Sequence, residues 1–213
     1  PDTFTRIDGQ ALCYLGKFHY FQGEPASGKS FVVILWVAQL LAAGGTVTYV
    51  DFEDTAATIV GRLLSVGVHG DRIRAGFHHV QPDGSQSPRE LASAVEAKNS
   101  DLVVFDGVAE ALAMWDFNED KAGDFLRWKE ELVAPQLRAG STVAAIDHVA
   151  KSKEDRGRWA RGTGAKLGTI DGVTYTVSST GFNQTTAGWV YISLQKDRNG
   201  GLPDKEKDRV AAI

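Results

Sequence analysis

The sequence has little of what marks an extracellular, zinc-binding or membrane protein. Its 213 residues include a single cysteine, Cys13, which excludes an intramolecular disulfide. That cysteine and five scattered histidines leave no spacing typical of a zinc site. A run of about 18 apolar residues is also missing, so we expect neither a membrane span nor a signal peptide. These absences predict a cytoplasmic, intracellular protein.

Basic residues do not outnumber acidic ones. The formal net charge is −4 at pH 7, which argues against a generally basic nucleic-acid coat protein, so contact with nucleic acid has to come from a local patch. A length of 213 residues with 43% hydrophobic residues suits one sizeable core and is short for two. We predict a single domain over residues 1–213, with an incoming strand or a clasp on a neighbouring subunit at 1–16 and a flexible tail at 199–213. Residue 1 is proline and not methionine, so the presence of flanking domains is left as an open question.

What the sequence does contain is a phosphate-binding loop. Residues 23–30 read GEPASGKS and match the P-loop pattern G-x-x-x-x-G-K-[ST]. A strand-prone aromatic run, 18–22, precedes the motif, and an apolar helix, 31–43, follows it, which is the required order. Lys29 is expected to reach the β- and γ-phosphates of ATP, and Ser30 to hold Mg²⁺. The predicted nucleotide-binding residues are Gly23, Glu24, Pro25, Ala26, Ser27, Gly28, Lys29, Ser30 and Phe31.

Two later strands end in carboxylates. The β-branched run 46–51 leads into Phe52-Glu53-Asp54, and the apolar strand 101–106 ends in Asp106. The second pattern is typical of Walker B, an aspartate at the carboxyl edge of a parallel sheet that can hold the Mg²⁺ shell. Acidic residues often end strands, so it is the position of Asp106 behind a P-loop that favours the metal role.

The alternation of strands and helices predicts the fold. It indicates an α/β domain with a mostly parallel central sheet flanked by helices and a C-terminal antiparallel hairpin. The further expected helices are 55–66, 88–98 and 124–138; the further strands are 76–80, 142–146 and the hairpin strands 172–179 and 188–195.

Five stretches of the sequence resemble the RecA-like P-loop ATPases. They read GEPASGKS, YVDFED, LVVFDG, AAIDHVAKS with RGTGA, and LQKDRNGG, and they cover roughly residues 15–203. Together they are most similar to the RepA-like hexameric helicases, relatives of the DnaB-type replicative helicases. The family often has a small residue or a second histidine where this chain has Asp147, so the chain departs from the family there.

The resemblance implies roles for individual residues. Glu53 would be the catalytic base and Asp106 the Walker B acid. His148 would be the sensor that links the γ-phosphate to the nucleic-acid loops; a purely structural histidine is the alternative. Lys196 and Arg198 would be finger residues that reach the phosphates of the neighbouring subunit; ordinary solvated charges at a strand end are the alternative.

A basic segment follows His148. Residues 151–168 contain six lysines and arginines against two acidic residues, a local charge of +4 in a chain of net charge −4. This segment is predicted to track a nucleic-acid backbone; a solvated surface loop, or a nucleic-acid path along residues 115–121, is the alternative. The predicted nucleic-acid-binding residues are Lys151, Lys153, Arg156, Arg158 and Arg161.

The function implied by the resemblance is Mg²⁺-dependent ATP hydrolysis by an oligomeric motor on single-stranded DNA. A homohexameric ring with shared ATP sites, acting as a DNA helicase in replication, is the leading interpretation. A RecA-like ATPase that does not unwind, such as a recombinase filament or a regulatory ring, remains the alternative. A small-molecule kinase is disfavoured because the sequence offers no obvious lid or second substrate site.

Overall fold

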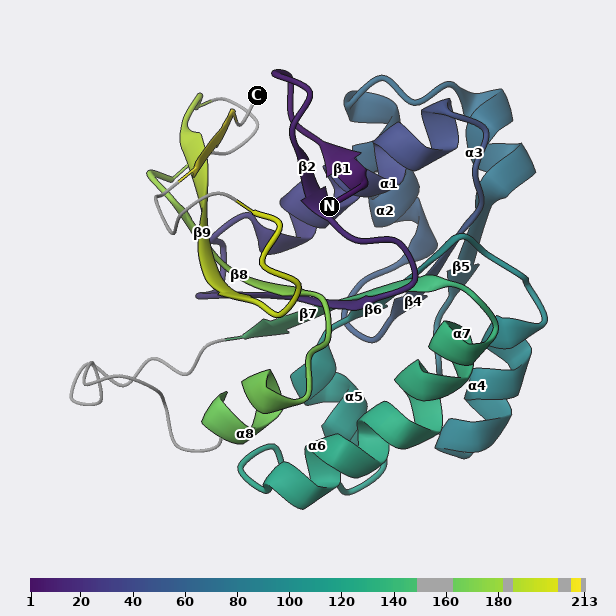
Figure 1. Cartoon of the computed structure of the whole chain (residues 1–213). Helices are drawn as coiled ribbons and strands as arrows, with labels where there is room; N and C mark the ends of the chain where they lie inside the picture. The colour runs from purple at the N-terminus through teal and green to yellow at the C-terminus, as the bar shows by residue number, and fades with distance from the viewer. Residues whose placement is uncertain (149–162, 182–185, 203–207, 212–213) are drawn as a thin grey trace.

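The computed structural model describes residues 1–148, 163–181, 186–202 and 208–211, and an eight-stranded sheet organises them (Figure 1). The strand order is β10-β9-β8-β3-β7-β6-β4-β5. The six strands from β8 to β5 are parallel, whereas β9 and β10 each pair antiparallel with their neighbour. The strands are β3 (Phe18–Gly23), β4 (Val47–Asp51), β5 (Phe77–Val80), β6 (Leu102–Asp106), β7 (Thr142–His148), β8 (Val173–Ser179), β9 (Trp189–Asp197) and β10 (Asp208–Ala211). The predicted α/β class, parallel sheet and C-terminal hairpin are confirmed.

Helices cover both faces of the sheet (Figure 1). One layer holds α1 (Lys29–Ala42), α2 (Ala56–Ser65) and α3 (Gly70–Gly76); the other holds α4 (Pro88–Glu96), α5 (Val108–Met114), α6 (Ala122–Trp128), a π-helical turn (Lys129–Val133), α7 (Ala134–Arg138) and α8 (Thr163–Gly168). Strand β6 shows why two cores form. Val104 packs in the core under α1, and Val103 and Phe105 pack in the core under α4 to α7, because successive side chains of a strand point to opposite faces.

The N-terminal segment forms a small antiparallel sheet on α1. Strands β1 (Thr3–Thr5) and β2 (Ala11–Cys13) pair with each other. Phe4 stacks on Trp36 of α1 at 5.6 Å between ring centroids, and the indole N–H of Trp36 donates to Thr3 Oγ1 at 3.0 Å. The segment predicted as an incoming strand or a clasp therefore packs on a helix of its own chain.

Four elements differ from the sequence prediction. The short helices α3 and α5 were not expected, since α3 begins and ends with glycine and α5 starts directly after the Walker B strand. The helix expected at 124–138 contains a π-helical turn just before Pro135, which has no N–H to donate to the preceding turn. The tail expected to be flexible from residue 199 includes strand β10, because backbone groups of 208–211 pair with β9.

Within the part of the chain that the structure describes, none of the helices has the length and apolar character needed to span a bilayer.

Candidate nucleotide-binding and catalytic site

The predicted P-loop, Walker B and sensor positions converge at one edge of the sheet. Parallel strands end at the same edge, and the register places Gly23 of β3 beside His148 of β7 and Asp51 of β4 beside Asp106 of β6. Glu53 follows in the turn after β4. This is the carboxyl edge of the strands, where open α/β sheets bind their ligands.

The P-loop turns sharply between β3 and α1. Gly28 has a φ of 88°, in the left-handed region that favours glycine, directly before the first residue of α1. A Cβ atom at Gly23 would lie 2.5 Å from Ser27 Oγ and from the carbonyl oxygen of Val177, so this close approach requires glycine. No side chain caps the N-terminus of α1. Its first N–H groups and the helix dipole therefore favour an anion such as a phosphate.

Lys29, His148 and Glu53 form a chain of polar contacts at this edge. Lys29 Nζ lies 2.9 Å from Nδ1 of His148, and Nε2 of His148 lies 3.0 Å from Oε1 of Glu53. A lysine ammonium can only donate, so Nδ1 accepts and the Nε2–H group donates to the carboxylate. The structure thus brings together the three residues that the sequence predicted as phosphate-binding, sensor and base.

Asp51 shapes the turn that carries Glu53. Its Oδ1 atom accepts hydrogen bonds from the N–H groups of Glu53 at 3.0 Å and Asp54 at 2.8 Å. Its Oδ2 atom lies 3.3 Å from Nε2 of His79 on β5. The Asp51 side chain is buried, so these contacts fix the backbone from which Glu53 projects.

Asp106 is buried at the end of β6, with one oxygen left for a ligand. The Tyr49 hydroxyl donates to its Oδ2 atom, and the nearby Ser30 side chain favours the charged form of the carboxylate and so opposes the rise in its pKa. The Oδ1 atom is inaccessible to solvent and has no hydrogen-bond partner in the described part of the chain. Hydroxyl and carboxylate oxygens are ligands that Mg²⁺ prefers. Ser30 and Asp106 therefore fit the shell of a Mg²⁺ ion delivered with a nucleotide.

Burial shifts the pKa values of three charged groups in the site. It lowers the pKa of Lys29, although the carboxylates of Glu53 and Asp106 oppose the change. It raises the pKa of Glu53, and the neighbouring Asp106 and Glu110 carboxylates add to that rise. Burial also raises the pKa of Asp106, which the hydrogen bond from Tyr49 opposes. Perturbed groups of opposite charge gathered at one place are typical of functional sites.

Sequence reasoning missed Glu110. It lies in the first turn of α5, and its carboxylate gathers with Glu53 and His148, with one ligand atom of each within 4.8 Å of the others. An acidic residue in the first turn of a helix is common, because it complements the helix dipole. The sequence around Glu110 therefore carried no signal beyond its position four residues after Asp106.

Asp147, the residue that departs from the family pattern, anchors the end of β7. It is buried, accepts a hydrogen bond from the Tyr20 hydroxyl, and lies 3.5 Å from Nζ of Lys166 on α8. Its Oδ1 atom also accepts the backbone N–H of His148 at 2.9 Å. These contacts hold the backbone of His148 and connect it to α8.

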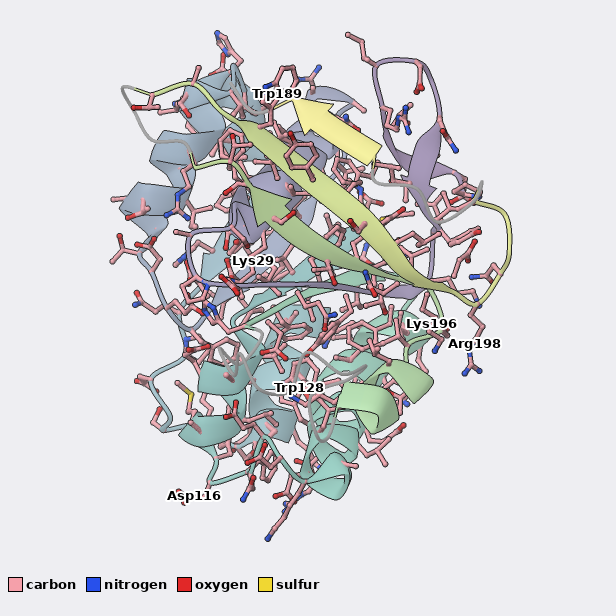
Figure 2. The ribbon with its side chains drawn as sticks, turned by 90° about the vertical axis from the view of Figure 1, so that its left-hand side faces the viewer. Lys29, Asp116, Trp128, Trp189, Lys196 and Arg198 are labelled. Carbon is pink, nitrogen blue, oxygen red and sulfur yellow. The ribbon has the colours of Figure 1, made fainter. Side chains whose placement is uncertain are left out.

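Lys196 and Arg198 lie at the opposite edge of the sheet. Lys196 pairs with Thr174 near the start of β8, which runs parallel to β3, and Figure 2 shows both cations well apart from Lys29. Lys196 Nζ donates to the carbonyl oxygens of Leu167 and of Ile170, the latter at 2.8 Å. Arg198 Nη2 donates to the carbonyl oxygen of Gly168 at 2.7 Å. In this chain both cations therefore bind carbonyl groups of the last turn of α8 and of the residues just after it, and not the P-loop of their own subunit.

Outside the described residues lie the five predicted to bind nucleic acid: Lys151, Lys153, Arg156, Arg158 and Arg161.

The alternative nucleic-acid path, residues 115–121, is described. The Trp115 ring packs edge-on against Phe52 at 5.9 Å, and its indole N–H donates to the carbonyl oxygen of Gln86 at 2.9 Å. The guanidinium of Arg127 lies 4.8 Å from the centre of the Phe117 ring. Since Phe52 precedes Glu53, this aromatic loop is in contact with the turn that carries the candidate base.

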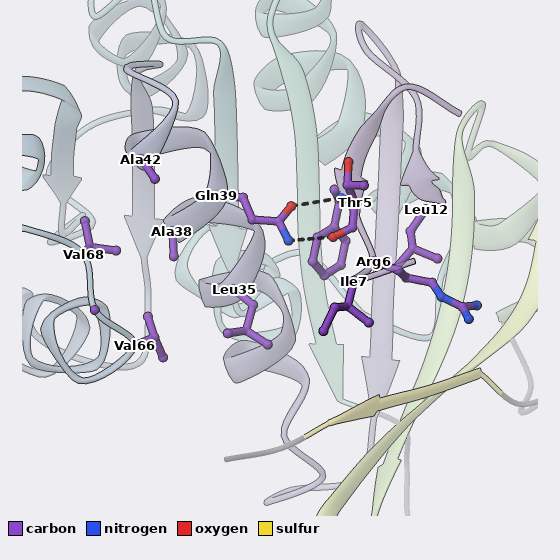
Figure 3. Close-up of a pocket in the computed structure, with 12 residues that line it drawn as sticks. Thr5, Arg6, Ile7, Leu12, Leu35, Ala38, Gln39, Ala42, Val66 and Val68 are labelled. Carbon is purple, nitrogen blue, oxygen red and sulfur yellow. Dashed lines mark hydrogen bonds between the residues drawn. The ribbon is translucent and has the colours of Figure 1, made fainter. Parts of the chain in front are cut away.

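A separate apolar cavity of about 480 Å³ lies between α1, the end of α2 and the N-terminal β1–β2 sheet. Figure 3 shows Leu35, Ala38 and Ala42 of α1 facing it, and the Gln39 side chain bonded to the backbone of Thr5. No residue of the P-loop lines this cavity. It is not part of the nucleotide site.

Comparison with known proteins places the chain in a family. Residues 9–154 match the family model AAA_25, described as an AAA domain. Protein RecA of Francisella tularensis subsp. novicida (strain U112) is 28% identical over 124 residues, which are 58% of this chain and 33% of the relative. Protein RecA of subsp. holarctica (strain LVS) matches to the same extent. The match thus spans about a third of the length of these relatives.

A solved structure has the same fold. The KaiC-like protein PH0186 from Pyrococcus horikoshii OT3 superposes with a TM-score of 0.68 at 14% sequence identity, covering 91% of this chain and 84% of that one. The family match, the RecA relatives and this shared fold agree with the P-loop at the carboxyl edge of a mostly parallel sheet. The chain belongs to the AAA_25 family of AAA domains and is built as a RecA-like P-loop ATPase.

Proposed function

We propose that this domain hydrolyses ATP, with Glu53 as the general base that activates the attacking water. The observation that carries the proposal is the contact chain from Lys29 through His148 to Glu53, beside the P-loop. Hydrolysis of ATP requires cations around the transferred phosphoryl group and a carboxylate near the attacking water. Both elements are gathered at this edge of the sheet.

Each residue has a defined task. The N–H groups of the P-loop and the Lys29 ammonium bind the phosphates, and Glu53 accepts the proton of the water. Ser30 and Asp106 would hold Mg²⁺, which supplies charge neutralisation of the phosphate oxygens when bound. His148 contacts both Lys29 and Glu53. A phosphate that draws Lys29 away would release one side of the imidazole, which suits a sensor.

The finger residues act between subunits in this proposal. Lys196 and Arg198 lie at the edge opposite their own P-loop, so they can approach phosphates only in a neighbouring copy. A cation supplied in trans is worth roughly 10³ to 10⁵ in rate in related phosphoryl transfers. Head-to-tail contacts form a ring when the rotation from copy to copy closes and a filament when it does not, and we propose the closed form, a hexamer.

We propose that the assembly moves along single-stranded DNA and unwinds duplex DNA. Support comes from the +4 charge of residues 151–168, a stretch that begins three residues after His148 of β7 and ends with helix α8. A change at the sensor would thus pass directly to a basic segment suited to a nucleic-acid backbone.

ATP turnover and strand displacement test the proposal together. We expect the domain to hydrolyse ATP with Mg²⁺, to turn over faster with single-stranded DNA, and to displace a strand from a forked duplex. ATPase activity stimulated by single-stranded DNA without displacement would favour the recombinase-type alternative. An ATPase rate that DNA does not change would favour a regulatory ring. Absence of ATP hydrolysis unless a phosphoryl acceptor is added would contradict the proposed ATPase function.

A further inference from the structure

Glu110 is a charged group in the site to which no role has been given. Helix α5 begins directly after Gly107, and Glu110 projects from its first turn toward Glu53. Its side chain is half-buried, and its Oε2 atom is inaccessible to solvent. This oxygen has no hydrogen-bond donor among the described residues. A buried carboxylate oxygen without a donor is costly, so its position calls for a partner.

Gly107 lies directly against the carboxylates of Glu53 and Glu110. A Cβ atom at this position would collide with Oε1 of Glu53 and with Oε2 of Glu110. The two oxygens therefore face the same small space, which a side chain at position 107 would fill. Oε1 of Glu53 is also the atom that faces Nε2 of His148 at 3.0 Å.

Two ionised carboxylates held this close repel each other, and such pairs commonly share one proton. A proton between Glu53 and Glu110 removes the repulsion and gives the buried Oε2 atom of Glu110 its missing hydrogen bond. The rise in the pKa of Glu53, caused first by burial and then by its acidic neighbours, agrees with this arrangement. Glu53 would then be held from two sides, by the imidazole of His148 and by Glu110.

We propose that Glu110 is a positioning residue for the base: it holds the Glu53 carboxylate over Gly107 through a shared hydrogen bond. This inference rests on the proposed ATPase function and deepens it. For this role Glu110 needs a side chain long enough to contact Glu53 and one N–H or O–H donor. It does not need a negative charge.

Three substitutions separate this role from a structural one. Glu110→Gln keeps the length and can donate an amide N–H to Glu53, so we expect kcat to stay within about threefold of the wild type. Glu110→Asp and Glu110→Ala lose the contact, so we expect kcat to fall about tenfold or more, with KM for ATP unchanged. Glu96→Gln and Glu96→Ala, at an exposed position of α4, serve as matched controls, and thermal unfolding checks the fold of every variant.

Two outcomes would overturn the inference. A wild-type kcat in Glu110→Asp would show that Glu53 needs no support from this residue, and this variant keeps the test valid if Glu110→Ala fails to fold. A kcat in Glu110→Gln as low as in Glu110→Asp would show that the charge itself is required. Glu53→Gln is measured in parallel: if it remains active, the proposed function fails, whereas an inactive Glu53→Gln with a fully active Glu110→Asp removes only the role of Glu110.

Discussion

The Nε2 atom of His148 lies 3.0 Å from Oε1 of Glu53, although 95 positions separate the two residues in the chain. Strand β6 lies between β7, which ends in His148, and β4, which leads into the turn that holds Glu53. The contact exists because β4 and β7 are parallel and end at the same edge, where the turn shaped by Asp51 brings Glu53 back toward His148. The candidate site is therefore a product of sheet topology.

Lys29→Ala should strongly weaken ATP binding. The substitution removes a buried ammonium that we propose binds the phosphates, and hydrogen bonds to charged groups contribute about 1.5 to 3 kcal/mol, or roughly 10- to 140-fold in Kd. Titration calorimetry with a non-hydrolysable ATP analogue measures the change. Lys17→Ala, which removes a half-exposed lysine paired with Asp171, is the control and should bind normally. Equal affinity in both variants would contradict the phosphate-binding role of Lys29.

The sequence predicted the central features of this site because they depend on local patterns. The P-loop spacing, the carboxylate of Asp106 at the end of an apolar run, and the alternation of strands and helices are all readable along the chain. The approach of Glu110 to Glu53 depends on how α5 leaves β6, and no local pattern records that path. The partners of Lys196 and Arg198 were missed for the same reason, since α8 and β9 meet only in the folded chain.

Arg198→Ala should bind nucleotide but lose turnover, and mixing it with Lys29→Ala should restore part of the activity. In a mixed assembly, an intact P-loop of the first variant meets an intact finger of the second. Steady-state ATPase assays over a range of mixing ratios and protein concentrations measure this. Loss of the bond to Gly168 should cost only about 1 kcal/mol of stability, which thermal unfolding checks against the exposed control Arg74→Ala. Inactivity at every ratio would contradict a shared site.

Stability should fall as the pH drops from about 6.5 toward 4, because His19 is buried as a neutral imidazole. Its Nε2–H group donates to the carbonyl oxygen of Tyr14 at 2.8 Å, and its Nδ1 atom accepts the N–H of Val173 at 3.1 Å. Burial lowers the pKa of His19 from 6.5 to about 4. Between these pH values His19 is protonated in the unfolded chain but stays neutral in the folded chain. The free energy of unfolding therefore falls, by about 3 kcal/mol once His19 is protonated in both states.

Denaturant unfolding at several pH values tests this dependence. His19→Gln removes the titrating group, so we expect a less stable protein whose unfolding free energy varies less between pH 6.5 and 4. His69→Gln, at an exposed position, should keep the wild-type dependence. An unchanged dependence in His19→Gln would assign the acid sensitivity to other groups.

Neutralising Lys153, Arg156 and Arg158 together should weaken single-stranded DNA binding and leave ATP affinity unchanged. Each phosphate contact that is lost reduces the slope of log K against log salt by about 0.7, so three contacts reduce it by about 2. Binding isotherms at four or more salt concentrations give the slope. An unchanged slope would move the nucleic-acid path to the loop at residues 115–121.

The most direct measurement is ATP hydrolysis by Glu53→Gln alongside its binding of Mg-ATP. The amide keeps the shape of the side chain and can still accept the hydrogen bond from His148, but it cannot take a proton from water. We expect Mg-ATP affinity within about threefold of the wild type and a kcat lower by roughly 10² to 10⁴. Hydrolysis at the wild-type rate would contradict the assignment of Glu53 as the base and redirect the search to Asp51 and Asp54.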